Sequence, residues 1–297
     1  MINFNFLKYR KIYYFLSTIL FAGSIVSLVV FGLKAGIDLT GGSILEIEFE
    51  AERPANSITR EKLSGLDLGE FSVQPAGEKG MILRMKELSE EEHQKVLEQL
   101  KEYQIKELRF ESIGPTISSE LRRKTKSVII LATLAIALYI TVAFGKVARP
   151  INSWQLGVIS LFSLLHDILI PLGILAIFGH FYGAQFTIPV IVALLTILGY
   201  SINNTVVTFD RIRENASRKD LADFDQVIND SLNQTLGRQL GTSLTTLFPL
   251  IFIFFLGGET LKYFSLVLIF GIICGVYSSL FLVAPILFDW IKRKKII

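Results

Sequence analysis

The sequence has 297 residues, of which 51% are hydrophobic and 19% charged, and its formal net charge is +3. Because soluble domains carry about 25% charged residues, this composition favours a membrane protein, and the small net charge gives no reason to expect a nucleic acid partner. The single cysteine, Cys274, lies in an apolar segment, which excludes an internal disulfide framework and a thiolate metal site.

Six segments have the length and apolar character of membrane-spanning helices, since a bilayer core requires about 20 mainly apolar residues. They cover residues 12–33, 128–144, 156–178, 186–209, 240–256 and 264–291. The first follows a short basic stretch, as in a signal peptide. Its apolar run is too long for that role, and no small-x-small cleavage site precedes Lys34. We therefore expect an uncleaved membrane anchor.

Basic residues are distributed unevenly over the short connections and the ends of the chain. If the N-terminus is cytoplasmic, the short outside loops contain only Lys262. The cytoplasmic segments then contain Lys8, Arg10, Lys11, Lys146, Arg149, Arg211, Arg213, Arg218, Lys219, Arg238 and the basic run at 292–295. This pattern follows the positive-inside rule. It predicts two cytoplasmic termini and places residues 34–126 outside.

Residues 34–126 have the composition of a small soluble domain. The stretch "SILEIEFE" alternates apolar residues with glutamates, which is typical of a half-buried strand. The segments that follow predict the order β-α-β-β-α-β, a ferredoxin-like α+β arrangement. The second helix opens with Ser89 and Glu92 at capping-box spacing, and His93 is expected on its solvated side. With no catalytic constellation, this domain is interpreted as a contact surface.

Three charged residues lie within or at the ends of the predicted spans, where such groups are functional candidates. Asp167 falls near the middle of the third span in "SLLHDILIPLG", Asp210 closes the fourth and Arg238 opens the fifth. We interpret Asp167 as part of an ion pathway or a structural network. Local pairing with His166 or with a backbone group is the alternative.

The fourth span ends in "GYSINNTVVTFDRIREN", residues 199–215, which places two asparagines deep in an apolar segment. Asn203 and Asn204 lie about 10 Å deeper than Asp210 at 1.5 Å rise per residue. Asn203 and Asp210 share a helical face, and hydroxyl side chains form a nearby stripe of Ser201, Thr205 and Thr208. For Asn203 and the hydroxyls, hydrogen bonding between helices is the alternative to an ion pathway, at about 0.6 kcal/mol per bond.

The charged end of this segment and a diglycine motif complete the set of candidates. Arg211 and Arg213 are expected at the cytoplasmic surface, as part of an anchoring and helix-terminating element. The stretch "DLTGGS", which begins at Asp38, lacks phosphate-binding spacing. Its Gly41 and Gly42 are expected to permit a tight turn with positive φ where the first span meets the domain.

Motifs for catalysis are absent from the sequence. It contains no HExxH, no paired GxGD aspartates, no GxSxG and no P-loop. We therefore expect neither an enzyme nor a metal site nor a cofactor, and no ATP use within this chain.

Four motifs in order, "GIDLTGGS", "LLHDILIPLG", "GYSINNTVVTFDRIREN" and "SLNQTLGRQLGTSLTTL", together resemble the SecF family, the smaller membrane subunits of the bacterial SecD–SecF complex. The resemblance extends from the first span to the last. It implies a multi-pass bundle of six transmembrane helices, half of an RND-type bundle, in the bacterial cytoplasmic (inner) membrane. A small ferredoxin-like outside domain lies between the first and second helices.

The resemblance also implies partners and a role. SecD is the expected partner, and the complex assists the SecY channel in the translocation and release of unfolded preproteins, driven by an ion gradient. The rivals are a purely structural subunit of the translocase and an independent RND-type exporter. An exporter of that type would carry two six-span halves in one chain, and this chain has one.

The chain departs from the family pattern at Asn204. The family usually has an aspartate there, associated with ion coupling together with an arginine that Arg238 matches. An amide cannot titrate, so Asn204 cannot be the group that changes charge during a cycle. Three alternatives remain: carboxylates of SecD carry the coupling, Asp167 or Asp210 substitutes for the missing group, or the chain is uncoupled.

Overall fold

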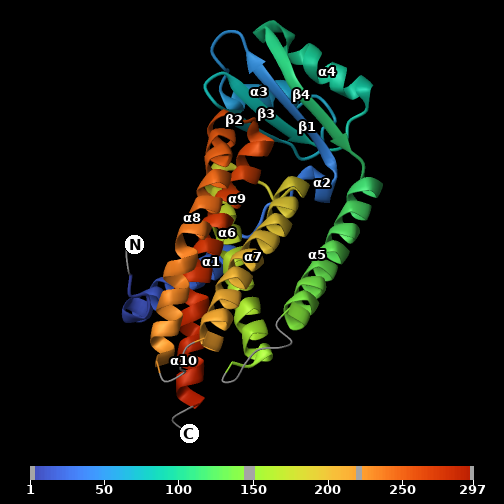
Figure 1. Ribbon diagram of the computed structural model, residues 1–297. Coiled ribbons are helices and arrows are strands. Elements are labelled where there is room, and N and C mark those ends of the chain that lie inside the picture. Colours follow the sequence, from blue (N-terminus) through green and yellow to red (C-terminus); the bar gives the residue numbers. More distant parts are fainter. Residues whose placement is uncertain (1–3, 144–150, 219–222, 295–297) are drawn as a thin grey trace. The chain divides into compact units, whose positions relative to one another are not determined.

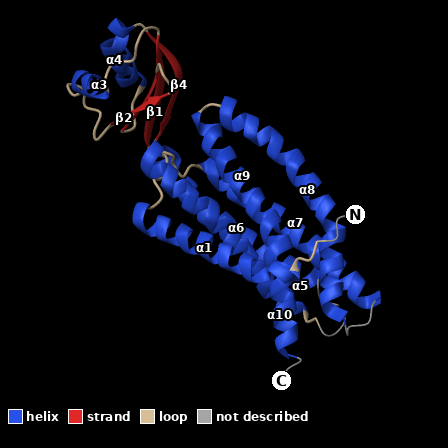
Figure 2. Cartoon of the chain, turned by 90° about the vertical axis from the view of Figure 1, so that its left-hand side faces the viewer, coloured by secondary structure: helices blue, strands red, loops and turns tan. Residues whose placement is uncertain are grey.

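The computed structural model describes residues 4–143, 151–218 and 223–294 (Figure 1). The chain forms two compact units. The helical unit comprises Met1–Lys34, Val128–Ala184 and Pro189–Ile297, and the sheet unit comprises Ala35–Ser127 and Gln185–Ile188. Figure 2 shows that the described strands form one sheet and that the other unit consists of helices.

Long helices build the helical unit. A 3₁₀ turn (Leu7–Tyr9) is followed by α1 (Arg10–Phe31), the second part of α5 (Pro115–Ala143), α6 (Ser153–Tyr182), α7 (Ile188–Arg218), α8 (Phe224–Leu256), α9 (Glu259–Ser278), a π-helical turn (Ser279–Val283) and α10 (Ala284–Lys294). Five described stretches are long and apolar enough to cross a membrane, namely Leu7–Phe31, Ser153–Tyr182, Ile188–Ser217, Phe224–Leu256 and Leu261–Arg293. They overlap five of the predicted spans.

The remaining predicted span, residues 128–144, falls on α5 except for its last residue, which lies outside the described residues. A sixth crossing therefore stays a prediction. The predicted orientation rests partly on Lys146, Arg149 and Lys219, which also lie outside the described residues.

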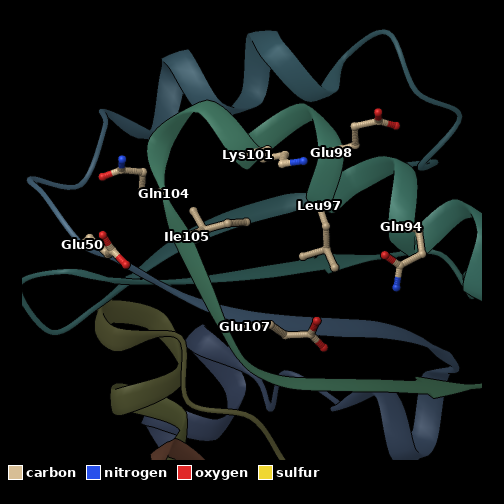
Figure 3. A pocket seen from close by; sticks show the side chains of 8 residues that line it. All are labelled: Glu50, Gln94, Leu97, Glu98, Lys101, Gln104, Ile105 and Glu107. Carbon is tan, nitrogen blue, oxygen red and sulfur yellow. The ribbon is translucent and has the colours of Figure 1, made fainter.

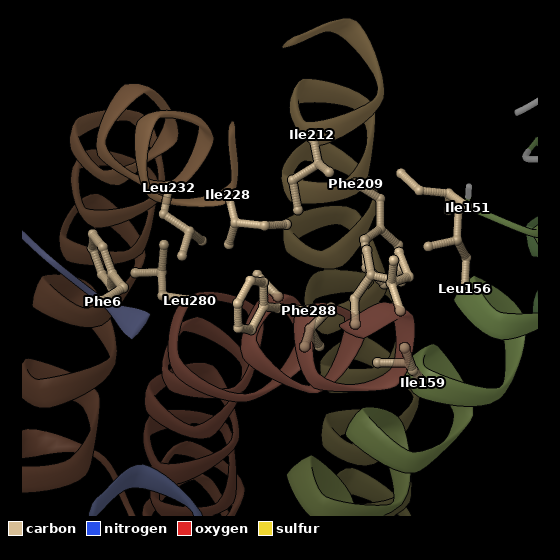
Figure 4. Packing of buried hydrophobic residues seen from close by; sticks show 14 of the residues in the cluster. Phe6, Ile151, Leu156, Ile159, Phe209, Ile212, Ile228, Leu232, Leu280 and Phe288 are labelled. Carbon is tan, nitrogen blue, oxygen red and sulfur yellow. The ribbon is translucent and has the colours of Figure 1, made fainter. Parts of the chain in front are cut away.

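Apolar side chains from distant parts of the sequence form the core of the helical unit. Figure 4 shows them pointing toward one another from the N-terminal segment, α6, α7, α8, the π-helical turn and α10: Phe6, Leu156, Ile159, Phe209, Ile212, Ile228, Leu232, Leu280 and Phe288. Large apolar side chains also lie on the outside of the helices, with Val29 80% and Leu256 81% exposed. Because a soluble surface rarely presents contiguous apolar patches of this kind, these faces are suited to lipid.

The sheet unit contains a four-stranded antiparallel sheet. Its elements are α2 (Ile37–Thr40), β1 (Gly42–Phe49), α3 (Asn56–Leu63), β2 (Ser72–Ala76), β3 (Gly80–Met85), α4 (Glu90–Leu100), a 3₁₀ turn (Lys101–Tyr103) and β4 (Ile105–Ile113). The strand order is β2-β3-β1-β4, so β2 and β4 are edge strands. The apolar residues of β1, Leu45, Ile47 and Phe49, are buried as the alternation predicts.

The start of α4 confirms the predicted capping box. Ser89 Oγ accepts from the backbone N–H of Glu92 at 3.3 Å, and the Glu92 carboxylate accepts from the backbone N–H of Ser89 at 2.8 Å. These contacts satisfy two donors that a helix start leaves free.

The prediction for His93 is wrong. The residue is 4% exposed, and its ring stacks on Phe110 of β4 with 3.7 Å between centroids. His93, Val96 and Leu100 form one buried stripe at i, i+3 and i+7. The many charged residues of the helix favoured a solvated position for His93. Its imidazole ring instead packs as an aromatic side chain on the buried face.

Candidate functional site

A buried carboxylate forms the centre of the polar site in the helical unit. Asp167 of α6 is 0% exposed. Its Oδ2 accepts from Ser201 Oγ of α7 at 2.5 Å and from Ser278 Oγ at the end of α9 at 2.7 Å. Three helices are therefore joined through one carboxylate oxygen, which fits the rule that a buried charge needs hydrogen-bond partners.

The second oxygen of the same carboxylate contacts the neighbouring histidine. Asp167 Oδ1 lies 2.9 Å from His166 Nδ1, so one proton must lie between these two atoms. The His166 ring lies parallel to Phe21 of α1 at 6.4 Å and close to parallel to Tyr277 of α9 at 6.2 Å. Its Nε2 is buried and has no hydrogen-bond partner among the described residues. The Asp167–His166 pair is thus bonded through one ring nitrogen, and the other ring nitrogen is left without a described partner.

Small residues allow α9 to approach this carboxylate. A Cβ atom added at Gly275 would lie 3.3 Å from Ser201 Cβ and 3.8 Å from Asp167 Oδ2. Ser163 extends the network, because its hydroxyl donates to Ser278 Oγ at 2.9 Å. The π-helical turn begins directly after Ser278, and such turns are frequent at functional sites.

The polar stripe of α7 is buried in full. Ser201, Asn204, Thr205 and Thr208 lie at i, i+3, i+4 and i+7, and each is at most 3% exposed. Asn204 Nδ2 has no hydrogen-bond partner among the described residues. The structure therefore places Asn204 inside the helical unit, on the same stripe as Ser201, whose hydroxyl donates to Asp167.

Gln239 of α8 joins a second buried network that the sequence did not single out. Its Nε2 donates to Thr208 Oγ1 at 2.8 Å, and its Oε1 accepts from Ser279 Oγ at 2.6 Å. The sequence signal for Gln239 is its position next to the charged Arg238 at the start of the predicted fifth span. Arg238 itself is exposed on the helical unit.

Asn203 and Asp210 lie on the exposed face of α7, away from the buried stripe. Asp210 forms an ion pair with Arg213 at 2.9 Å. The structure thus brings Asp167 together with the α7 stripe, and leaves Asn203, Asp210 and Arg238 outside this buried network.

The charged end of α7 does not terminate the helix, contrary to expectation. The helix continues to Arg218 because its charged residues find partners within it and on α8. Arg211 contacts Glu214 at 2.5 Å and Gln234 of α8 at 2.6 Å, and Asn215 donates to Ser231 of α8 at 2.9 Å. This segment fastens α7 to α8.

The diglycine motif belongs to the sheet unit and has the predicted backbone. Gly41 and Gly42 have φ of +80° and +124°, backbone angles that residues other than glycine rarely adopt. A Cβ atom on Gly42 would lie 2.7 Å from the Met85 carbonyl oxygen. Asp38 Oδ2 accepts from the backbone N–H of Ile188, the first residue of α7, at 3.0 Å, so the motif also caps a helix.

Two family models match this chain, one over the helices that carry the buried polar site and one over the diglycine motif. Residues 92–293 match the C-terminal model of the protein export membrane proteins SecD/SecF. Residues 26–52, which include the diglycine, match the SecD/SecF GG motif.

Curated relatives match almost the whole chain. The protein translocase subunit SecF of Thermobaculum terrenum is 36% identical over 96% of this chain and 93% of the relative, and that of Anaerolinea thermophila is 33% identical over 96% and 94%. The crystal structure of SecDF from Thermus thermophilus, a translocon-associated membrane protein, matches with a TM-score of 0.83 and 32% identity. It covers 97% of this chain, which spans 39% of the SecDF chain. The chain therefore belongs to the SecD/SecF family of protein export membrane proteins, and its relatives are SecF subunits.

Proposed function

We propose that this chain is the SecF subunit of a bacterial translocase complex and that SecD is its partner. The chain matches SecF relatives along almost their whole length and corresponds to 39% of a SecDF chain, which supports a partnership with SecD. In this proposal α5 provides a sixth span, both termini are cytoplasmic, and the sheet unit is a ferredoxin-like domain on the outer side.

The proposed function is to assist the SecY channel in the translocation and release of preproteins at the outer face of the inner membrane, driven by an ion gradient. The observation that carries the coupling is the buried Asp167–His166 pair. Moving one charge through the membrane is worth about 2.3 kcal/mol per 100 mV, so the cycle requires a group that changes its charge. Asn204 cannot provide one, whereas a carboxyl with an imidazole can.

The geometry supports a route from proton binding to helix movement. Ser201 and Ser278 both donate to the same carboxylate oxygen. Hydrogen bonds to a charged acceptor are about twice as strong as neutral ones. A proton on Asp167 weakens both bonds, which loosens α7 and α9 from α6. Loss of the proton restores them.

The test is preprotein release from vesicles that contain this chain and SecD, with and without an imposed proton or sodium gradient. We expect Asp167→Asn to remove the gradient response and to preserve release without a gradient. Ser160→Ala is the matched control, because Ser160 is a buried residue of the same helix whose hydroxyl has no partner among the described residues. A full gradient response of Asp167→Asn would place the coupling elsewhere, with SecD as the first candidate.

Asn204 supports a second function, that of a structural subunit without coupling. In that case the unmodified complex shows no gradient response, and Asn204→Asp creates one. A response of the unmodified chain that Asp167→Asn removes would exclude this second function.

A further inference from the structure

A groove runs between α4 and the start of β4 in the sheet unit. It has a volume of about 680 Å³. The side chains that line it come from the helix, from the turn before β4, from the start of β4 and from the residue after β1: Glu50, Gln94, Leu97, Glu98, Lys101, Gln104, Ile105 and Glu107 (Figure 3).

The strand that forms one wall of this groove has an open edge. β4 pairs with β1 and, in the described part of the chain, has no strand on its other side. The Gln104 carbonyl oxygen accepts from the Glu50 N–H at 3.2 Å. Hydrogen-bonded and non-hydrogen-bonded pairs alternate in an antiparallel ladder. Up to the register shift that follows Glu107, Ile105 and Glu107 therefore direct their N–H and C=O groups away from β1. The side chains of the same two residues line the groove.

The chemistry of the groove is both apolar and acidic. Leu97 and Ile105 are half-buried and contribute apolar surface. Three glutamates face one lysine in the lining, Glu50, Glu98 and Glu107 against Lys101. The buried ring of His93 lies against one of these carboxylates, with Nε2 3.4 Å from Glu107 Oε2. The acidic wall is therefore supported from inside the domain.

We propose that this groove binds an extended, basic polypeptide segment as an additional strand along β4. Main-chain bonds to Ile105 and Glu107 give affinity without regard to sequence, as in other cases of strand addition. Basic side chains lie opposite the glutamates, and an apolar side chain covers Leu97 and Ile105. The identification of the segment as part of an unfolded preprotein rests on the proposed function. The binding itself does not.

The test uses the full chain in a non-ionic detergent and fluorescence anisotropy with labelled ten-residue peptides. One peptide alternates Val with Lys, a second alternates Val with Glu, and a third is the Val–Lys peptide with N-methyl groups on alternate backbone nitrogens. We expect binding of the first peptide, weakened as salt is raised, and at least tenfold weaker binding of the other two.

Variants locate the binding site. Glu98→Gln with Glu107→Gln should weaken the binding of the Val–Lys peptide by about fivefold, because exposed charge pairs contribute up to about 1 kcal/mol each. The matched control, Glu61→Gln with Glu78→Gln, replaces two exposed glutamates outside the groove and should bind the peptide unchanged.

Four outcomes would overturn the proposal: no binding of the Val–Lys peptide, equal binding of the Lys and Glu peptides, equal binding of the N-methylated peptide, or a dimer of the chain through this edge that peptide does not displace. The measurement needs neither SecD nor a gradient, so its failure leaves the proposed coupling untouched. Conversely, Asp167→Asn should bind the peptide normally even when it loses the gradient response.

Discussion

At the scale of single residues, Asp167 and Asn204 are both buried in the helical unit, but they differ in chemistry. Asp167 lies in a complete hydrogen-bond set with two serines and a histidine, whereas the amide nitrogen of Asn204 has no described partner. Only Asp167 can gain or lose a proton. Because α7 has the amide of Asn204 in its buried stripe, Asp167 of α6 is the one buried carboxylate among the described residues of this unit.

Ser201→Ala tests the bond between α7 and this carboxylate. The variant removes one of two donors to Asp167 Oδ2. Hydrogen bonds to charged groups contribute about 1.5–3 kcal/mol, so we expect a lower thermal unfolding temperature in detergent and a shifted pH dependence of the gradient response. Ser160→Ala serves as the control. Equal unfolding temperatures of the two variants would contradict a charged acceptor at Asp167.

Gly42→Val tests the diglycine turn. Valine at this position must adopt a positive φ, and its Cβ would also collide with the Met85 carbonyl oxygen. Strained backbone alone costs about 1–3 kcal/mol, so we expect a less stable sheet unit, measured by hydrogen exchange of β1 and β3. Gly65→Val is the control, since a Cβ there meets nothing within 4 Å. Normal protection in Gly42→Val would refute the turn.

At the scale of elements, regular patterns were predictable and mixed ones were not. Strict alternation identified β1, and the capping box identified the start of α4. His93 was misplaced because its partner Phe110 is distant in sequence. The length of α7 was underestimated because its charged end is held by α8 rather than by solvent. Asp167 was found by its charge, but Gln239 is neutral, and its role depends on packing that the sequence does not reveal.

Glu92→Gln tests the capping box through pH. The backbone N–H of Ser89 donates to the Glu92 carboxylate and lowers the pKa of Glu92 below its ordinary value of 4.5. A lowered folded pKa stabilises the fold above the unfolded pKa, and this stabilisation disappears as pH falls through the folded pKa. Gln keeps the acceptor without the charge.

Hydrogen exchange of the α4 amides in the full chain, corrected for intrinsic exchange, measures this effect. The wild type should be more protected than Glu92→Gln at pH 6, and the difference should shrink as the pH falls below 4.5, the ordinary pKa. A difference that does not depend on pH would mean that the capping contact acts through geometry alone.

At the scale of the whole molecule, the exposed polar side chains of the helical unit become informative. Arg238 is exposed beside the buried Gln239. Asn203 and Asp210 are exposed on α7 in the same way. Exposed charge in a membrane-spanning unit is unfavourable, so these faces require a protein or aqueous surface. In the proposed complex SecD provides this surface, and the proposal therefore predicts that residues outside the buried network contribute to export.

Arg238→Gln should impair preprotein export in a strain that lacks another copy of this subunit, because in the proposed complex the exposed charge of Arg238 faces SecD and would lose its partner there. Arg238→Lys keeps the charge and should retain more export than Arg238→Gln. Arg293→Gln replaces an exposed arginine near the C-terminal end. It is the control and should export normally.

Co-purification of SecD separates two causes of an export defect in Arg238→Gln. If SecD is lost, Arg238 holds the complex together. If SecD is retained while the gradient response falls, Arg238 acts on coupling across the interface. Normal export of Arg238→Gln would exclude both roles and leave coupling to the buried network around Asp167.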